Sequence, residues 1–346
     1  MNTDVHLLYL KSSPASRSPY RIVDSQQHEI LWINDFLDAQ KLRNLSLQSI
    51  RTYAYDLLHF ARWWSRQEST ALEQLNESRL LDYVRHQMES IPKPTPQTIN
   101  HRLTVIHCLY RFHFGGELPR PRGSVQSVYK TRSSFGFGRP GRRVGGLRLK
   151  QPHRVIVPLS FEEVSLFWSS FRTYRDLGIT ALMLFNGLRS CEIVGLRLDE
   201  LRLSEGQFRI RGKGNKERIL PLQEDTIRTL ESYLQTERPL VDSPLVFLCL
   251  KGRKRGSPLT LVGLRSLFRH HRRLSNVLIA NPHRFRHTFG TDMARAGVSL
   301  PALMRLMGHS HIHTTMIYVN LLPEDVWREY RNAMQKIHKP PPTLEP

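Results

Sequence analysis

The chain has 346 residues, enough for about two domains, and carries 51 lysine and arginine residues against 30 aspartate and glutamate residues, a formal net charge of +21. It has no run of about 18 apolar residues, no paired cysteines and no recognisable secretory leader, which argues against a membrane span, a disulfide framework and a cysteine-rich zinc module. This charge indicates an anionic partner, and we expect nucleic acid, not a membrane, in a cytoplasmic, nucleoid-associated protein.

The N-terminal third of the chain predicts a basic helical bundle. Residues 1–23 are interpreted as an extension without a separate DNA-binding domain, and residues 24–118 predict four short helices. In SLQSIRTYAYDLLHFARWWSRQ the apolar residues recur at i, i+3 and i+4, and Ser46 precedes them as a predicted N-cap. Arg51 and Arg102 lie on these predicted helices and are expected to contact DNA.

The next segment, residues 119–158, contains glycine, proline and basic residues but no aspartate or glutamate. A disordered, solvated linker is one interpretation of this composition. A segment that wraps around DNA is the other, because a basic chain can follow phosphates without reading sequence. We favour this second interpretation, a DNA-clasping connector, and expect Arg142 and Arg143 to contact DNA.

Residues 159–338 predict a second domain, followed by a loose tail at 339–346. Ser160 and Glu163 form a capping-box pattern at the start of its first helix. QFRIRGKGNKERILPL predicts a β-hairpin. Further helices are expected near 224–236, 260–274, 284–296, 299–307 and 324–336. The predicted fold class is therefore mostly α with a small antiparallel β-sheet (α+β).

Two fragments of the second domain place a basic residue where it could bind phosphate. In NGLRSCEI, Arg189 begins a predicted helix one turn before Glu192, so it can present two N–H groups to a phosphate or pair with that glutamate. In GKGNKER, Lys213 is flanked by glycines at the hairpin tip, where a solvated charged turn is the commoner structure. Lys216 is the alternative lysine in that turn.

Two later fragments contain histidines. In HRFRH, His283 and Arg286 are three residues apart and would share one helix face. His283 and His287 also have the i, i+4 spacing of a zinc pair, but arginines flank them and no glutamate follows His283 as in HExxH, which disfavours a metal. In MGHSHIHTTMIY, His309 precedes Tyr318 by nine residues, although a single tyrosine is more often an ordinary half-buried helix residue.

Together, GLRSCEI, GKGNKER, HRFRH and MGHSHIHTTMIY resemble, in order and spacing, the tyrosine recombinases of the phage-integrase family, which includes the Xer proteins. The resemblance implies a helical core-binding (SAM-like) domain at 24–118 and a tyrosine-recombinase catalytic domain at 159–338. It also implies site-specific cleavage and rejoining of double-stranded DNA through a 3′-phosphotyrosyl intermediate, with strand exchange via a Holliday junction. The enzyme would act as a homo-tetramer on DNA, as a monomer or dimer when free, and without a cofactor or metal.

The resemblance also assigns roles to single residues. The implied catalytic set is Arg189, Lys213, His283, Arg286, His309 and Tyr318, with Glu192 supporting the first arginine. Two arginines can neutralise the charge that grows on the phosphate oxygens, and His309 can add a third hydrogen bond. A free tyrosine has a pKa near 10, so Tyr318 needs a base, for which His283 is suited. Lys213 can give the departing 5′ oxygen a proton, which an arginine hardly releases.

Several alternatives share this chemistry. The long basic linker and the extension before residue 24 favour integration or excision of a mobile element, or transposon cointegrate resolution, over chromosome dimer resolution. A type IB topoisomerase and a zinc hydrolase are the alternative enzymes, and the intact residue set disfavours a DNA-binding protein whose activity has lapsed. An accessory DNA-bending or regulatory protein could take part. The last predicted helix, with Trp327 and Tyr330 in its apolar stripe, could dock in cis or on a neighbouring subunit.

Overall fold

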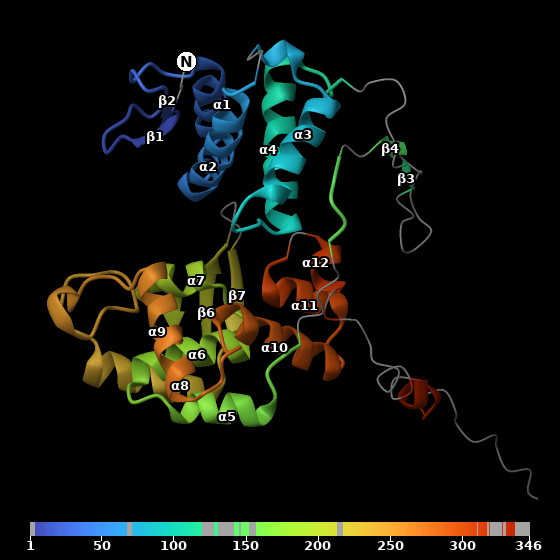
Figure 1. The fold of residues 1–346 in the computed structure, drawn as a ribbon. Helices are drawn as coiled ribbons and strands as arrows, with labels where there is room; N and C mark the ends of the chain where they lie inside the picture. The colour runs from blue at the N-terminus through green and yellow to red at the C-terminus, as the bar shows by residue number, and fades with distance from the viewer. Residues whose placement is uncertain are drawn as a thin grey trace, which may run out of the picture. The chain divides into compact units, whose positions relative to one another are not determined.

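The computed structural model describes residues 4–67, 71–119, 128–130, 142–144, 147–151, 157–212, 217–309, 311–316, 318, 327 and 330–335, with only the backbone at 128–130, 142–144 and 313. The chain divides into two compact units, Met1–His153 and Arg154–Pro346 (Figure 1). The division falls within the predicted linker, residues 119–158. The predicted tail, 339–346, lies outside the described residues. None of the described helices combines the length and apolar character that crossing a membrane requires.

The first unit contains the four predicted helices. They are α1 (Leu31–Leu42), α2 (Leu47–Trp64), α3 (Glu77–Glu89) and α4 (Pro96–Phe114), with a short 3₁₀ turn, η1 (Leu72–Gln74), before α3. The predicted cap of α2 is confirmed, because the Ser46 hydroxyl accepts a hydrogen bond from the backbone N–H of Ser49. Gly115 ends α4 in the left-handed region at φ +68°, which a glycine adopts without strain.

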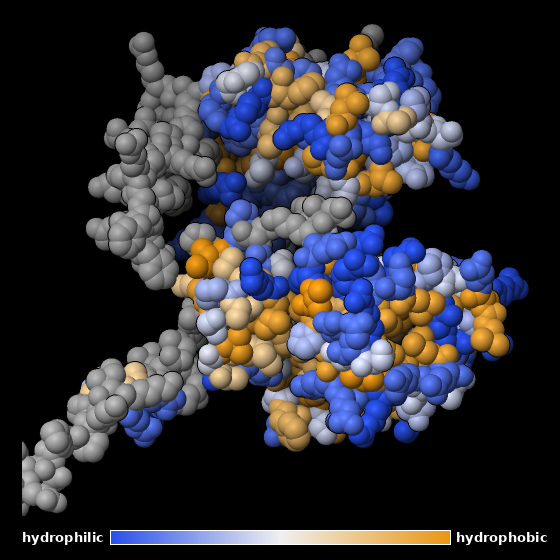
Figure 2. Space-filling model, turned by 180° about the vertical axis from the view of Figure 1, so that it is seen from behind, coloured by the Kyte–Doolittle hydropathy of each residue, from blue (hydrophilic) through white to orange (hydrophobic). Residues whose placement is uncertain are grey.

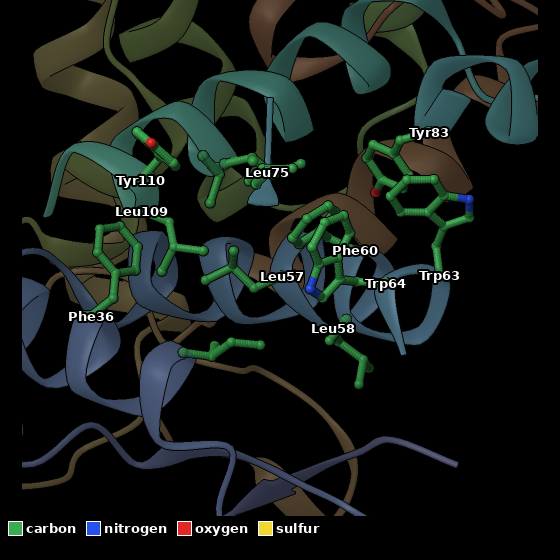
Figure 3. Packing of buried hydrophobic residues seen from close by; sticks show 14 of the residues in the cluster. Phe36, Leu57, Leu58, Phe60, Trp63, Trp64, Leu75, Tyr83, Leu109 and Tyr110 are labelled. Carbon is green, nitrogen blue, oxygen red and sulfur yellow. The ribbon is translucent and has the colours of Figure 1, made fainter. Parts of the chain in front are cut away.

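Aromatic side chains form much of the core of this unit (Figure 3). The Phe60 ring from α2 lies 5.3 Å from the Tyr83 ring of α3 and 5.6 Å from the Trp64 ring, measured between ring centroids. Side chains of this size bury large apolar areas and dominate the energetics of a small core. The helical bundle therefore has a hydrophobic core of its own.

A β-hairpin that the sequence analysis did not predict extends this core toward the N-terminus. β1 (His6–Tyr9) pairs antiparallel with β2 (Tyr20–Val23), and both strands pack against α2. Ile22 is buried in the core, and the buried Arg21 side chain pairs with Asp38 of α1 over 2.7 Å and with Glu29. The described part of the predicted extension is thus an integral part of the first unit.

Two parts of the predicted linker also have regular contacts. β3 (Val128–Lys130) pairs antiparallel with β4 (Arg142–Val144). Leu149 packs on the first unit, where its backbone N–H and C=O bond to the side-chain amide of Asn100 on α4 at 2.8 and 2.9 Å. The described end of the connector is therefore attached to the helical bundle.

The second unit is built on α6 (Tyr174–Asn186), a largely buried helix that packs against both α8 (Glu224–Ser232) and α10 (Pro282–Arg295). A three-stranded antiparallel sheet has the order β5 (Leu201–Arg202), β6 (Gln207–Arg211), β7 (Glu217–Pro221), and β6 and β7 are the predicted hairpin. The other helices are α5 (Phe161–Ser169), α7 (Ser190–Gly195), α9 (Leu261–Leu274), α11 (Leu300–Met307) and α12 (Ile312–Met316). Short helical turns are η2 (Leu198–Glu200), η3 (Leu203–Glu205), the π-helical η4 (Tyr233–Glu237) and η5 (Gly252–Lys254).

The predicted fold class, mostly α with small antiparallel β-sheets, is confirmed, and so is the Ser160–Glu163 capping box. One helix limit differs from the prediction, because the helix expected at 224–236 changes to π-helical geometry after Ser232. The short helix α12 precedes Tyr318. In the space-filling view hydrophilic residues cover much of the surface, with hydrophobic residues scattered among them (Figure 2).

Candidate active site

The buried carboxylate of Glu192 binds two arginines. Gly187 ends α6 in the left-handed region, and two residues later Arg189 is the N-cap of α7. The Glu192 carboxylate accepts the backbone N–H and Nη1 of Arg189, each at 2.9 Å. Burial alone would raise the pKa of this carboxyl group, but the hydrogen bonds and charges of Arg218 and Arg189 outweigh it and hold the pKa below its ordinary value. Arg189 and Glu192 are therefore in direct contact, and the supporting role of Glu192 stays a prediction.

Arg218 is the second partner of Glu192, and the sequence analysis missed it. Its Nη1 and Nη2 donate to the two carboxylate oxygens of Glu192, each at 2.9 Å, a bidentate pair. The Arg218 side chain is only 12% exposed, and that of Glu192 only 3%. The sequence contained a signal for this pair. Arg218 and the buried Leu220 are two residues apart and therefore share the inward face of β7, and an arginine that faces inward needs a carboxylate partner.

Three arginines bind three consecutive carbonyl groups at the end of α11. Arg218 Nε donates to Leu306 O at 3.0 Å, Arg286 Nη2 to Met307 O at 2.6 Å, and Arg189 Nη2 to Gly308 O at 3.0 Å. The last carbonyls of a helix lack partners within the helix and carry partial negative charge, so cations are favoured there. The three guanidinium groups therefore converge directly before His309.

Arg286 is the buried member of this group. It lies on α10, and its Nη1 donates to the carbonyl oxygen of Gly187, at the end of α6. Burial, and next the charge of Arg189, lower the pKa of Arg286 to about 10. The guanidinium therefore keeps its proton at neutral pH.

His309 lies between Arg286 and α12. Its Nε2 is 2.9 Å from Arg286 Nη2 and its Nδ1 is 2.9 Å from the hydroxyl of Thr315, which is fully buried. Because a guanidinium only donates, Nε2 is the acceptor, and the imidazole is neutral with its proton on Nδ1. Burial and the charges of Arg286, Arg189 and Arg218 lower the pKa of His309 to about 4, which agrees with a neutral ring. Thr315 is a second residue that the sequence analysis did not single out.

The Tyr318 ring is docked against these residues. It stacks on His309 at 6.2 Å between centroids and 9° between planes, and lies 5.0 Å from the His287 ring. Phe289, Leu303 and Met307 surround it in a small hydrophobic cluster. Burial raises the pKa of Tyr318 above its ordinary value, although Arg286 and Arg189 lower it. The docked phenol therefore keeps its proton at neutral pH.

His283 lies in the first turn of α10 with its side chain open to solvent. Its ring is 4.8 Å from that of His287, nearly perpendicular, so ring contacts connect His283 to Tyr318 through His287. Partial burial and the charges of Arg286, Arg284 and Arg189 lower the pKa of His283. Among the described residues, no group of three or more His, Cys, Asp or Glu side chains is arranged to hold a metal ion.

The residues predicted to contact DNA fall into different environments. Arg51 is exposed on α2, with its guanidinium 5.6 Å from the centre of the Tyr55 ring. Arg102 is only 17% exposed and points to Gln87 at 2.8 Å and Asp56 at 3.7 Å, so it would have to leave these partners to reach a phosphate. Lys213 and its alternative Lys216, and the side chains of Arg142 and Arg143, lie outside the described residues.

A basic loop that the sequence analysis missed precedes α9. Its cations are Lys251, Arg253, Lys254 and Arg255, all exposed. Two backbone bonds close the loop, from Cys249 N–H to Ser257 O at 2.9 Å and from Gly256 N–H to Cys249 O at 2.8 Å. The four positive charges are therefore displayed on a closed loop that could bind an anionic surface.

Comparison with known proteins adds independent evidence. The protein-family model described as phage integrase family matches residues 148–325. A second family model, described as phage integrase, N-terminal SAM-like domain, matches residues 33–114. Tyrosine recombinase XerD of Staphylococcus haemolyticus is 32% identical over 158 residues, which cover 45% of this chain and 54% of that protein, so the match spans about half of that relative's length. Tyrosine recombinase XerD of Lacticaseibacillus casei is 28% identical over 298 residues, covering 83% of this chain and 91% of that protein.

A solved structure has the same fold. It is XerH site-specific recombinase bound to palindromic difH substrate, in a post-cleavage complex, with a TM-score of 0.61 and 20% identity over 87% of this chain and 83% of that one. At this level of identity the likeness concerns the fold alone. The first family model covers just over half of the residues, and this chain therefore belongs to the phage integrase family.

Proposed function

We propose that this chain is a site-specific DNA recombinase, a tyrosine-type strand transferase that cleaves and rejoins DNA through a 3′-phosphotyrosyl intermediate. One observation carries the proposal. The Tyr318 ring stacks on His309, and His309 accepts a hydrogen bond from the buried Arg286. A tyrosine, a histidine and an arginine are thus in contact where a second arginine, Arg189, also converges.

In this proposal Arg189 and Arg286 bind the scissile phosphate. At rest their Nη2 atoms donate to the consecutive carbonyl oxygens of Gly308 and Met307. A phosphodiester would compete with those carbonyls for the N–H groups, and the two guanidinium groups would stabilise the charge that develops on its oxygens in the transition state. Glu192 and Arg218 hold Arg189 in place, so little reorganisation is needed when the phosphate arrives.

Tyr318 is the proposed nucleophile. Its hydroxyl oxygen attacks phosphorus, a 3′-phosphotyrosyl bond forms, and the bond to the 5′ oxygen breaks. His283 takes the phenolic proton. Lys213 gives a proton to the departing 5′ oxygen, which leaves as a hydroxyl group. Because the phosphodiester bond energy is kept in the new ester, the strand can be rejoined to another 5′ end without ATP or a metal.

His309 needs one change before it can donate to the phosphate. Its Nε2 accepts from Arg286 in this structure, so it has no proton to give at that atom. When Arg286 turns to the phosphate, Nε2 is released and the imidazole can bind there as the other tautomer or as the cation. Phosphate binding and the activation of His309 would then be coupled through one hydrogen bond.

The proposed assembly is a homo-tetramer on two DNA duplexes. In the described part of the helix predicted at 324–336, the Trp327 and Tyr330 rings contact each other, and these residues are 65% and 56% exposed. Such an apolar face favours docking on a neighbouring subunit. We further propose a nucleoid-associated location in the cytoplasm, an accessory DNA-bending or regulatory protein, and a role in mobile-element recombination, which the long basic connector favours.

A covalent trap tests the proposed function. Wild type and Tyr318→Phe are expressed with their native DNA, lysed in strong detergent and purified, and any attached DNA is sequenced. We expect DNA on the wild type alone, with a single recurrent sequence that identifies the site and its element. Scattered sequences would indicate a type IB topoisomerase, and a site at the chromosome terminus would indicate chromosome dimer resolution. DNA attached equally to both proteins would exclude Tyr318 as the nucleophile.

A further inference from the structure

The connection that carries Lys213 leaves the sheet from the ends of β6 and β7. β6 ends at Arg211 and β7 begins at Glu217, and these two residues are the last cross-strand pair before the connection. Lys213 follows two residues after Arg211, and residues 213–216 lie outside the described part of the chain. The contacts of the last pair therefore decide from where Lys213 is presented.

Arg218 holds β7 directly after the connection. Its guanidinium pairs with the buried Glu192 carboxylate, each bond at 2.9 Å, and donates to the carbonyl oxygen of Leu306 at 3.0 Å. Glu192 in turn binds Arg189, one of the two arginines that would bind the phosphate. The β7 end of the hairpin is therefore attached to the proposed phosphate site.

Arg211 holds β6 directly before the connection. Its Nε lies 3.2 Å from Oε1 of Glu200 in η2 and 3.3 Å from Oε1 of Glu217. The Glu200 side chain is only 4% exposed, and its Oε2 accepts the backbone N–H of Arg197 at 3.1 Å. Because a buried carboxylate needs a partner for its charge, Glu200 restrains the half-exposed Arg211 more than a surface pair would. The β6 end of the hairpin is therefore attached to η2.

We infer that Arg211 is a positioning residue for protonation of the leaving group, because its pair with Glu200 holds the strand end from which Lys213 reaches the departing 5′ oxygen. The inference rests on the proposed role of Lys213 as the general acid. Without Arg211, β7 would keep its contacts through Arg218, so phosphate binding is retained while the β6 end is released. A general acid contributes on the order of 100-fold or more to the rate, and a loosely placed one forfeits part of that.

The test compares Arg211→Met and Glu200→Gln with Arg209→Met, Lys213→Ala and wild type as full-length proteins. Arg209 is the matched control, because it lies on the same strand and pairs with the same Glu217, at 3.7 Å, in an exposed contact. The probe is a nicked duplex with the sequence recovered from the wild-type covalent adduct. A second duplex has sulfur in place of the departing 5′ oxygen, and sulfur leaves without needing a proton.

Three quantities are measured: the thermal midpoint, the DNA dissociation constant and the single-turnover rate of adduct formation on each duplex. The rates are compared at a temperature where every variant is folded. A change that only weakened the fold would slow both duplexes alike, whereas a misplaced acid slows the oxygen duplex alone.

We expect Arg211→Met and Glu200→Gln to form the adduct roughly tenfold more slowly on the oxygen duplex, and within about twofold of wild type on the sulfur duplex. Their dissociation constants should stay near that of wild type, and Arg209→Met should match wild type throughout. Lys213→Ala should lose more on the oxygen duplex and also recover with sulfur.

A wild-type rate of Arg211→Met on the oxygen duplex, a loss that sulfur does not restore, or a loss of DNA binding in proportion to the rate would each overturn the inference. If sulfur restores Arg211→Met but not Lys213→Ala, Arg211 acts through another group and the inference is wrong. If the wild type itself forms no adduct, the proposed function fails instead.

Discussion

The guanidinium of Arg286 donates to Nε2 of His309 over 2.9 Å, and this contact fixes the imidazole proton on Nδ1, where it faces the Thr315 hydroxyl. His309 therefore has one hydrogen-bond partner on the phosphate-binding side and one on the side of α12. The same α12 leads to Tyr318, whose ring stacks on His309. The orientation of one imidazole is thus linked to the arginine that would bind phosphate and to the segment that carries the tyrosine.

Thr315→Val should slow strand cleavage by about fivefold. Valine keeps the shape of threonine but removes the hydroxyl that holds His309 Nδ1, and a lost hydrogen bond of about 1 kcal/mol corresponds to a rate change of that order. Thr314→Val is the matched control, because Thr314 is exposed. Single-turnover rates of adduct formation measure the effect. Equal rates for the two variants would show that Thr315 does not orient His309.

Arg218→Met should destabilise the protein by roughly 3 kcal/mol, because it removes the bidentate partner of the buried Glu192 carboxylate and leaves that charge only partly compensated. Glu192 would keep only Arg189, and the end of β7 would lose its bond to Leu306 O. Arg209→Met on β6 is the control, since the ion pair of Arg209 with Glu217, at 3.7 Å, is exposed and its loss should change stability by less than about 1 kcal/mol.

Urea unfolding of both variants measures this difference. The Arg218 variant should also show lower cleavage than the Arg209 variant at a temperature where both are folded, because Arg189 would lose the carboxylate geometry that Arg218 maintains. Similar midpoints for the two variants would contradict the role assigned to the pair of Arg218 and Glu192.

Local signals explain which structural features the sequence predicts. The Ser46 cap and the Ser160–Glu163 capping box depend on residues three apart, and the structure has both. Arg218 was missed because its partner, Glu192, lies 26 residues earlier and meets it only after the sheet packs against α7. Thr315 was missed for a similar reason, because its hydroxyl matters through a tertiary contact with His309.

Tertiary contacts also explain two differences in the first unit. Arg102 lies on a basic helix, but its guanidinium contacts Asp56 of α2 and Gln87 of α3. Helix periodicity alone does not reveal these two contacts. The strands β1 and β2 have four residues each and no glycine-containing turn between them. They gain their stability from burying residues such as Ile22 against the helices, a contact that no local pattern indicates.

The stability of the protein should fall as the pH drops from about 6.5 to 4. The pKa values of His287 and His309 are each lowered from 6.5 to about 4, in both cases first by burial and then by neighbouring cationic or imidazole groups. Between these pH values the unfolded chain binds more protons than the folded one, so the free energy of unfolding rises with pH. The stabilisation is fully present above pH 6.5 and is lost as the pH falls toward 4.

His287→Gln removes one of these groups. The slope of unfolding free energy against pH between pH 4 and 6.5 should therefore decrease by the amount that corresponds to up to one bound proton. Chemical unfolding at half-unit steps from pH 4 to 8 measures the slope. Above pH 7 the curves of wild type and variant should run parallel, which serves as the internal control. Identical slopes below pH 6.5 would show that His287 takes up its proton equally well in the folded state.

The basic loop before α9 should contribute to DNA binding through phosphate contacts. Replacing Lys251, Arg253, Lys254 and Arg255 with glutamine should make the plot of log binding constant against log salt concentration less steep. The magnitude of its slope should fall by about 3 to 4, because each phosphate contact adds roughly 0.9 to that magnitude. The loss of affinity should be the same for the recovered recombination site and for unrelated DNA, since phosphate contacts carry no sequence information.

The control is Arg228→Gln, because Arg228 is exposed but already paired with Glu224. Fluorescence anisotropy between 50 and 300 mM salt gives both slopes. An unchanged slope in the fourfold variant would show that the loop does not lie on DNA, and a loss confined to the recovered site would show that it reads bases instead.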